Sequence, residues 1–393
     1  MSSKKALEAI DFQKYVDNEK ENQFFYKIGL IGPSRVGKSS MLASLLEEAK
    51  TVFAQSLVSI EPFVDEDGIS LTKDRIKNTI NNIVSGLDYS TFDPGYGIGT
   101  ADPFIFDLVI KISAEEKQKN KSAQLRLAIL DYPGGWLKEP QNADQKIWKK
   151  CEQWIKDSSV IIVPIDSNLI MEADNKEKTK ASRELLQVLE VEKLVRDWAK
   201  GRWLKQESGL LLFLPVKCET YFDDNGGIYN KSQELYQRMH QFYGDVIEAA
   251  QQEMSEKNED NQETTQDSFL KRMVTKTSSY TIEYHPVDTI GCIELANANW
   301  EEKNGKLSLD CQYLVRNPSN YIPKRKPLGN IGVLNSICKH MVENRRNSGM
   351  FRKFWDKLSG NDKLLTDAIN RLSQQKPGSR FKEIAKGNIA KRG

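Results

Sequence analysis

The residues at 32–39, Gly-Pro-Ser-Arg-Val-Gly-Lys-Ser, have the form G-x-x-x-x-G-K-S. In such a loop Gly32 and Gly37 let the backbone curl until successive N–H groups point inward, where they and the next helix's N-terminus attract phosphate oxygens. Lys38 would reach the β- and γ-phosphates, and the Ser39 hydroxyl would hold Mg²⁺. The pattern therefore predicts a phosphate-binding loop, or P-loop, whose binding residues are Gly32, Pro33, Ser34, Arg35, Val36, Gly37, Lys38, Ser39 and Ser40.

The residues around this loop supply the elements that it needs. The apolar run 24–31 predicts a buried strand before the loop. After the loop, apolar residues recur at helical spacing over 41–49. A strand that enters the loop and a helix that leaves it favour a P-loop over the alternative, an ordinary glycine-rich turn with a surface lysine.

A second motif, Asp-Tyr-Pro-Gly-Gly-Trp-Leu at 131–137, follows the apolar run 127–130. An aspartate at the carboxyl end of a strand beside the P-loop strand can reach Mg²⁺, so Asp131 is a candidate metal ligand and catalytic residue. Gly134, three residues later, is placed to offer its backbone N–H to the γ-phosphate. The alternative is that Asp131 only caps a helix or shapes a turn.

The elements that must position these motifs alternate between strand and helix, which predicts an α/β fold built on a mostly parallel sheet with helices on both faces. An antiparallel hairpin joins the strict alternation at 104–112 to the strand at 125–129. Further strands are expected at 160–165, 210–216 and 280–287, and helices at 143–157, 178–205 and 229–254. An insertion at about 50–102 contains a helix near 72–86, and the polar stretch at about 251–275 is expected to be a mobile loop.

Together the two motifs resemble those of the TRAFAC class of P-loop GTPases, and within it the YcjX-like family and related GTPases of bacterial conflict systems. The resemblance lies in the loop at 32–39, with its internal Arg35, and in the D-Y-P-G-x-W-L run at 131–137. It is diffuse elsewhere in 24–345. It implies a three-layer GTPase fold, GTP and GDP as nucleotides, and Mg²⁺.

GTPases of this class recognise guanine with an N/T-K-x-D run at the end of a strand. The best match here is Val216-Lys217-Cys218-Glu219, in which valine replaces Asn or Thr and glutamate replaces Asp. Glu219 has the same two acceptor oxygens on a longer stem, so Lys217 and Glu219 are candidate guanine-binding residues. The alternative is an exposed ion pair at the strand end. The loop 288–292 is expected to add a backbone contact to the guanine O6.

A second departure concerns hydrolysis, because many GTPases place a water-positioning glutamine where this chain has Gly135. Two roles for Arg35 stay open. It supplies transition-state charge in cis, as the arginine at this position of guanylate-binding proteins does, or it stiffens the loop through an outward ion pair. The switch threonine that contacts Mg²⁺ or the γ-phosphate is expected at Thr100, with Thr91 behind it.

Composition and charge narrow the function classes. Five cysteines form no C-x-x-C pair, and three histidines leave little material for a metal centre. The net charge of +2 is uneven, because residues 341–393 carry 13 Lys and Arg against 5 Asp and Glu. Such a tail suits contact with nucleic acid, an anionic membrane or an acidic protein, or it is a solvated appendage.

No apolar run approaches the roughly 20 residues of a membrane span, and the N-terminus lacks a signal-peptide core, so a cytoplasmic protein is expected.

The expected organisation is an N-terminal helical extension at 1–23, a P-loop GTPase domain at 24–345 and a basic helical tail at 346–393. The expected function is that of a Mg²⁺-dependent GTPase with low basal turnover, acting as a switch or assembly regulator with a protein partner or by self-association. Two alternatives stay open. One is a P-loop ATPase or kinase, and the other is an interaction module that holds nucleotide with little hydrolysis.

Overall fold

The computed structural model describes residues 25–53, 58–65, 67–94, 101–112, 123–255, 278–316, 321–344 and 380–390. The predicted N-terminal extension at 1–23, Thr100, the loop at 256–275 and most of the tail lie outside these residues. Residues 251–255, predicted to begin the mobile loop, instead belong to a helix, α9.

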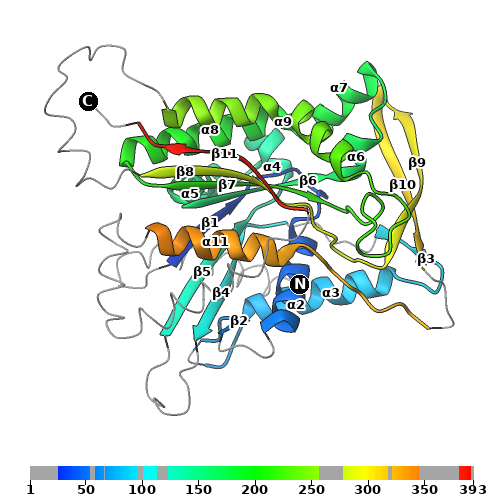
Figure 1. Ribbon diagram of the computed structural model, residues 1–393, viewed down its shortest axis with the longest axis horizontal. Helices are drawn as coiled ribbons and strands as arrows, with labels where there is room; N and C mark the ends of the chain where they lie inside the picture. Colours follow the sequence, from blue (N-terminus) through cyan, green and yellow to red (C-terminus); the bar gives the residue numbers. More distant parts are fainter. Residues whose placement is uncertain are drawn as a thin grey trace, which may run out of the picture.

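A mixed sheet of eight strands forms the centre of the molecule, in the order β11-β8-β7-β6-β1-β5-β4-β2 (Figure 1). Strands β8, β7, β6, β1 and β5 run parallel to one another, whereas β4 and β11 run antiparallel to their neighbours β5 and β8. The sheet is therefore mostly parallel, as predicted, and the hairpin β4–β5 is confirmed. The bounds are β1 Phe25–Leu30, β2 Val58–Pro62, β4 Phe104–Ile112, β5 Ala123–Asp131, β6 Val160–Asp166, β7 Gly209–Val216, β8 Ser279–Tyr284 and β11 Lys382–Asn388.

Helices cover both faces of this sheet because its central strands are apolar on both sides. In β6, Ile161 and Val163 pack with one set of helices, whereas Val160 and Ile162 pack with the other set. The first set is α5 Gln145–Asp157, α8 Val188–Lys205 and α9 Ser232–Ser255, and the second is α2 Lys38–Phe53, α3 Leu71–Gly86 and α11 Asn330–Asn344. The result is a three-layer α/β arrangement (Figure 1).

A second, three-stranded sheet, β3-β10-β9, lies beside the main one (Figure 1) and was not predicted. Strands β9 Ile293–Lys303 and β10 Lys306–Val315 form a hairpin closed by Asn304 and Gly305, whose φ angles are 55° and 71°. Two positive φ values are the signature of a type I′ turn, for which Asn-Gly is the preferred sequence. This sheet, α3 and the loop after β8 share a small apolar cluster, Ile83, Leu87, Ile290, Cys292, Ile293, Tyr313 and Val315.

Three predicted elements are corrected by the structure. The helix expected at 178–205 is two helices, α7 Lys176–Leu185 and α8, separated at Gln187, whose φ is 51°. The insertion contains α3 as predicted, but also β2 and the short strand β3 Thr91–Phe92. The tail is not helical at 382–388, because β11 pairs there with β8. Short helices complete the fold: α4 Gly135–Lys138, η4 Pro140–Asn142 and α6 Ser167–Met171.

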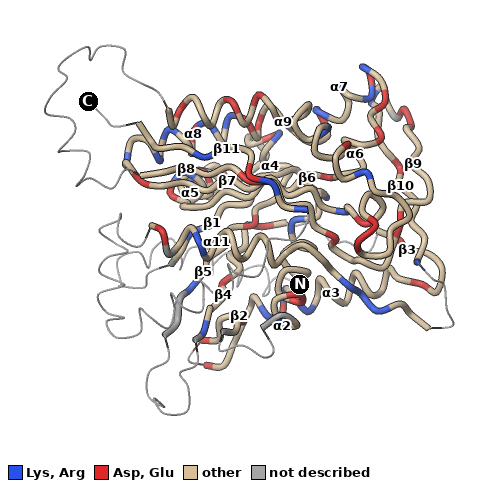
Figure 2. Tube along the Cα trace, in the orientation of Figure 1, with Lys and Arg blue, Asp and Glu red and all other residues tan. Residues whose placement is uncertain are grey.

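Basic and acidic residues are interspersed along the described elements (Figure 2). None of the helices in the described part of the chain is long and apolar enough to span a membrane.

Candidate nucleotide-binding site

The carboxyl ends of the parallel strands meet at one edge of the sheet, where open α/β folds bind their ligands. The loop 31–37 follows β1, Asp131 ends β5, and Asp166 ends β6. Lys217 follows β7, and Thr289 lies in the segment after β8. Residues from five separate parts of the sequence are therefore brought to one edge of the sheet.

The loop 31–37 has the backbone of a curled phosphate-binding loop. Arg35 and Gly37 have positive φ angles of 63° and 105°, and helix α2 begins directly afterwards at Lys38. The Lys38 ammonium turns back into the loop and donates to the carbonyl oxygens of Gly32, at 3.1 Å, and Pro33, at 3.0 Å. Its side chain is 6% exposed, and burial lowers the pKa of Lys38, an effect opposed by the nearby Asp131 carboxylate. A buried cation enclosed by a curled backbone suits an anionic ligand.

Ser39 and Asp131 lie together at the start of α2. The Ser39 hydroxyl donates to Asp131 Oδ2 at 3.0 Å, and Lys38 Nζ lies 3.9 Å from Asp131 Oδ1. A hydroxyl and a buried carboxylate are hard oxygen donors of the kind that Mg²⁺ accepts beside phosphates. The donor set thus fits Mg²⁺, which when bound would neutralise phosphate charge. The N-cap of the next helix, α4, is Gly134, so the alternative that Asp131 caps this helix is wrong, whereas its alternative role in shaping the turn is not tested by this contact.

The segment after Asp131 is fixed by aromatic packing. Tyr132 is fully buried and lies edge-on to Trp148 of α5, with the ring centroids 5.4 Å apart. Trp136 also meets Trp148 edge-on, at 6.4 Å. These contacts hold Gly134, which lies between the two anchored rings in sequence, against the phosphate-binding loop.

Gly134 is so close to this loop that it has no room for a side chain. A Cβ atom there would lie 2.0 Å from the Ser34 nitrogen and 2.2 Å from the Pro33 carbonyl carbon. We expect Gly134→Ala to displace one of the two segments and to lower affinity for a nucleoside triphosphate about tenfold or more, measured by calorimetry. Gly135→Ala is the matched control, because a Cβ there meets only the Ser34 hydroxyl oxygen, at 4.0 Å. Equal affinities for the two variants would contradict this assignment.

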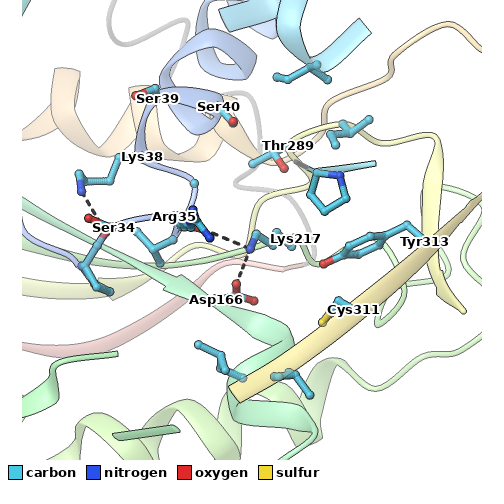
Figure 3. Close-up of a pocket in the computed structure, with 18 of the residues that line it drawn as sticks. Ser34, Arg35, Lys38, Ser39, Ser40, Asp166, Lys217, Thr289, Cys311 and Tyr313 are labelled. Carbon is cyan, nitrogen blue, oxygen red and sulfur yellow. Dashed lines mark hydrogen bonds and ion pairs between the residues drawn. The ribbon is translucent and has the colours of Figure 1, made fainter. Parts of the chain in front are cut away.

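A cavity of about 580 Å³ opens from the phosphate-binding loop across the edge of the sheet (Figure 3). Its walls come from four regions. The phosphate-binding loop and the start of α2 contribute Pro33, Ser34, Arg35, Val36, Gly37, Lys38, Ser39 and Ser40. The region of α3 and β3 contributes Thr79, Asn82, Ile83, Phe92, Asp93 and Pro94, and the hairpin β9–β10 contributes Ile293, Ser308, Leu309, Asp310, Cys311 and Tyr313. The edge of the main sheet and the region of α6 and α7 contribute Gly134, Asp166, Leu169, Leu185, Leu186, Lys217, Thr289 and Ile290. The phosphate-binding loop brings the cations Arg35 and Lys38 to one end of the cavity, and Cys311 and Tyr313 of β10 lie at the other end (Figure 3).

Lys217 lies between these two ends (Figure 3). Its ammonium pairs with the carboxylate of Asp166, and its Nζ lies 3.5 Å from the Arg35 carbonyl oxygen. Lys217 itself has a φ of 59°, in the left-handed region, so the backbone turns sharply where β7 ends. Lys217 therefore lines the cavity, and its binding to guanine stays a prediction.

Glu219 occupies a different place from the one expected. Its side chain is 2% exposed and does not belong to the cavity wall. Its Oε1 accepts the backbone N–H groups of Ile290, at 2.8 Å, and Gly291, at 3.2 Å. Burial, and then the charge of Asp288, raises the pKa of Glu219. Glu219 therefore supports the loop 288–292, and the alternative of an exposed ion pair is wrong.

The other predicted site residues are mostly brought together, but the wall residues from α3, β3, α6, α7 and β10 were not predicted, and neither was Asp166. Gly32 and Asp131 lie behind the wall rather than in it, and Thr91 starts β3, whose next residue Phe92 is in the wall. Asp166 was missed although, like Asp131, it ends a buried strand, which was the available signal. Tyr313 was missed with its hairpin. Its hydroxyl accepts from the Asn168 amide at 2.7 Å, which ties β10 to α6.

These features define an α/β protein with a strand–GxxxxGKS–helix unit, consistent with a P-loop NTPase fold. No protein-family model matches the sequence, and no curated protein matches it. Among solved structures, the S. cerevisiae Ski7 GTPase-like domain, bound to GDP and inorganic phosphate, is similar with a TM-score of 0.23 and 11% identity. The similarity spans 81% of this chain and 76% of that chain.

Proposed function

We propose that the chain binds and hydrolyses GTP with Mg²⁺ and acts as a nucleotide-controlled switch or assembly regulator. The observation that carries the proposal is the convergence of Lys38, Ser39 and Asp131 at the start of α2, with Gly134 packed on the same loop. In the proposed reaction water attacks the γ-phosphorus, the bond to the β,γ-bridging oxygen breaks, and GDP and orthophosphate leave. Loss of the γ-phosphate then releases the segment that contains Gly134.

As part of the same proposal, the nucleoside lies beside the loop 288–292, at the end of the cavity away from Lys38. Thr289 and Ile290 of this loop, and Lys217, belong to the cavity wall. Thr100 is retained as the proposed switch threonine. The motif resemblance extends the proposal to a bacterial defence or stress system. We also propose that the protein is cytoplasmic and works with a protein partner or by self-association.

The proposal is tested by Mg²⁺-dependent binding of GTP, GDP, ATP and ADP to the purified chain, followed by phosphate release. We expect GTP and GDP to bind more tightly than ATP and ADP, with Mg²⁺ strengthening triphosphate binding. No binding of any of these nucleotides would refute the proposal.

An ATPase is the second candidate function. It is favoured because Glu219, the predicted guanine-binding residue, accepts hydrogen bonds from backbone N–H groups and does not line the cavity. Glu219→Gln separates the two possible roles of this residue. Gln keeps a side-chain oxygen for the N–H groups of Ile290 and Gly291 but loses the second acceptor oxygen that guanine recognition needs. Because we assign Glu219 to the loop, we expect GTP and ATP affinities within about threefold of wild type. A selective loss for GTP of about 1–3 kcal/mol would instead show direct recognition of guanine by Glu219.

A further inference from the structure

The C-terminal residues of the described chain return to the nucleotide site. Strand β11 pairs antiparallel with β8, with Lys382 opposite Tyr284. Because β11 starts where β8 ends, the residues just before β11 lie at the edge of the sheet that carries the cavity. Arg380 is the first of these described residues.

The Arg380 side chain is buried between two aspartates and one phenylalanine. Its Nη1 and Nη2 donate to Asp288 Oδ1 and Oδ2, at 2.8 and 2.9 Å, and its Nε donates to Asp224 Oδ2 at 2.8 Å. The guanidinium carbon lies 4.0 Å from the centroid of the Phe222 ring. Arg380 is 5% exposed and Asp288 is 0% exposed, so this two-pronged ion pair is shielded from water. A planar, bidentate contact of this kind fixes both distance and orientation.

Asp288 opens the loop that lines the nucleoside end of the cavity. The next two residues, Thr289 and Ile290, are in the cavity wall. The backbone of Asp288 pairs with Leu328, and Arg325 Nη2 donates to the Thr289 carbonyl oxygen at 3.0 Å. Together with Glu219, these contacts hold the loop backbone, and Arg380 is the contact supplied by the C-terminal segment.

We propose that Arg380 is a positioning residue for the loop 288–292, beside which the nucleoside binds. Packing of residues 380–390 against this loop then sets the affinity for the nucleoside and leaves phosphate binding unchanged. This inference rests on the proposed function of the cavity. The separation follows from the geometry, because Arg380 contacts Asp288 beside Thr289 and Ile290, whereas the phosphate end is built by the loop after β1 and by Asp131.

The test compares a nucleoside triphosphate with inorganic tripolyphosphate, which offers the phosphates without the nucleoside. Both affinities are measured by calorimetry on the full chain, using GTP and ATP. Arg380→Lys keeps the positive charge but loses the bidentate contact. We expect it to weaken binding of the preferred nucleoside triphosphate about tenfold, and to leave tripolyphosphate affinity within about twofold.

Lys382→Ala is the matched control. Lys382 belongs to β11, and its ammonium donates to Gln233 Oε1 at 2.7 Å and lies over the Tyr236 ring, away from the loop 288–292. We expect this variant to bind both ligands as the wild type does. If Arg380→Lys fails to fold, Asp224→Asn replaces it, because Asp224 is the more exposed partner of Arg380 and its loss leaves the pair with Asp288 intact. The same selective loss, of about threefold, is expected.

The outcomes separate this inference from the proposed function. Equal losses for both ligands, or no loss for either, would overturn the positioning role while leaving nucleotide binding in place. A wild-type chain that binds neither ligand would overturn the proposed function and the inference with it. A loss of affinity confined to the nucleoside triphosphate supports both the proposed function and the positioning role of Arg380.

Discussion

Replacing Lys38 with methionine is expected to lower the affinity for nucleoside triphosphates about a hundredfold or more, for GTP and ATP alike. Lys38 is the buried cation of the phosphate-binding loop, 6% exposed and aimed at the carbonyl groups of Gly32 and Pro33. A phosphate would replace these neutral partners with a charged one, and charge-assisted contacts in a shielded site are worth about 1.5–3 kcal/mol each. Methionine keeps a similar length and removes the charge. Calorimetric titration in the presence of Mg²⁺ measures the loss.

Lys50→Ala is the control for this variant, because Lys50 is exposed in the last turn of the same helix, far from the loop. It should bind nucleotide as the wild type does. Circular dichroism is used to check whether Lys38→Met is folded, because the change removes the cation beside the buried Asp131. A folded Lys38→Met protein with wild-type affinity would exclude the assigned site.

The phosphate end of the site could be predicted from sequence because each of its parts is local. The glycines and Lys38 act within one loop, and Asp131 is marked by its place at the end of an apolar strand. Pairing of β1 with β5 then brings the two motifs together, as the strand pattern implied. Local sequence signals and one strand pairing were therefore sufficient to predict the phosphate end of the site.

The nucleoside end could not be predicted in the same way, because distant segments build it. The position of Glu219 beside Ile290 and that of Arg380 beside Asp288 depend on packing across 71 and 92 residues of sequence. Strand β11 is rich in lysine and polar residues, and it becomes a strand only by pairing with β8. No glycine or proline in the sequence marks the break between α7 and α8 at Gln187. By contrast, Asn304-Gly305 was a local hairpin signal that could have revealed β9 and β10.

The rate of hydrolysis is expected to depend on Arg35, because Gly135 has no side chain to orient water. Arg35 is an exposed residue of the phosphate-binding loop and lines the cavity. Among the described residues no acidic side chain forms an ion pair with it, so the alternative of an outward ion pair finds no partner there. A cation at this position suits the charge that develops during γ-phosphate transfer.

Arg35→Ala should therefore cut the stimulated rate of GTP cleavage about a thousandfold while changing GTP affinity by less than about threefold. Single-turnover cleavage measured across protein concentrations tests this, since self-association is one proposed route to stimulation. Arg35→Gly is the matched variant: the φ of 63° at this position strains alanine but not glycine, so Arg35→Gly should lose the same rate and unfold no more readily than Arg35→Ala. A rate that tracks stability across the two variants would show that Arg35 only shapes the loop. A rate unaffected by either change, and independent of protein concentration, would leave Arg35 without a part in catalysis.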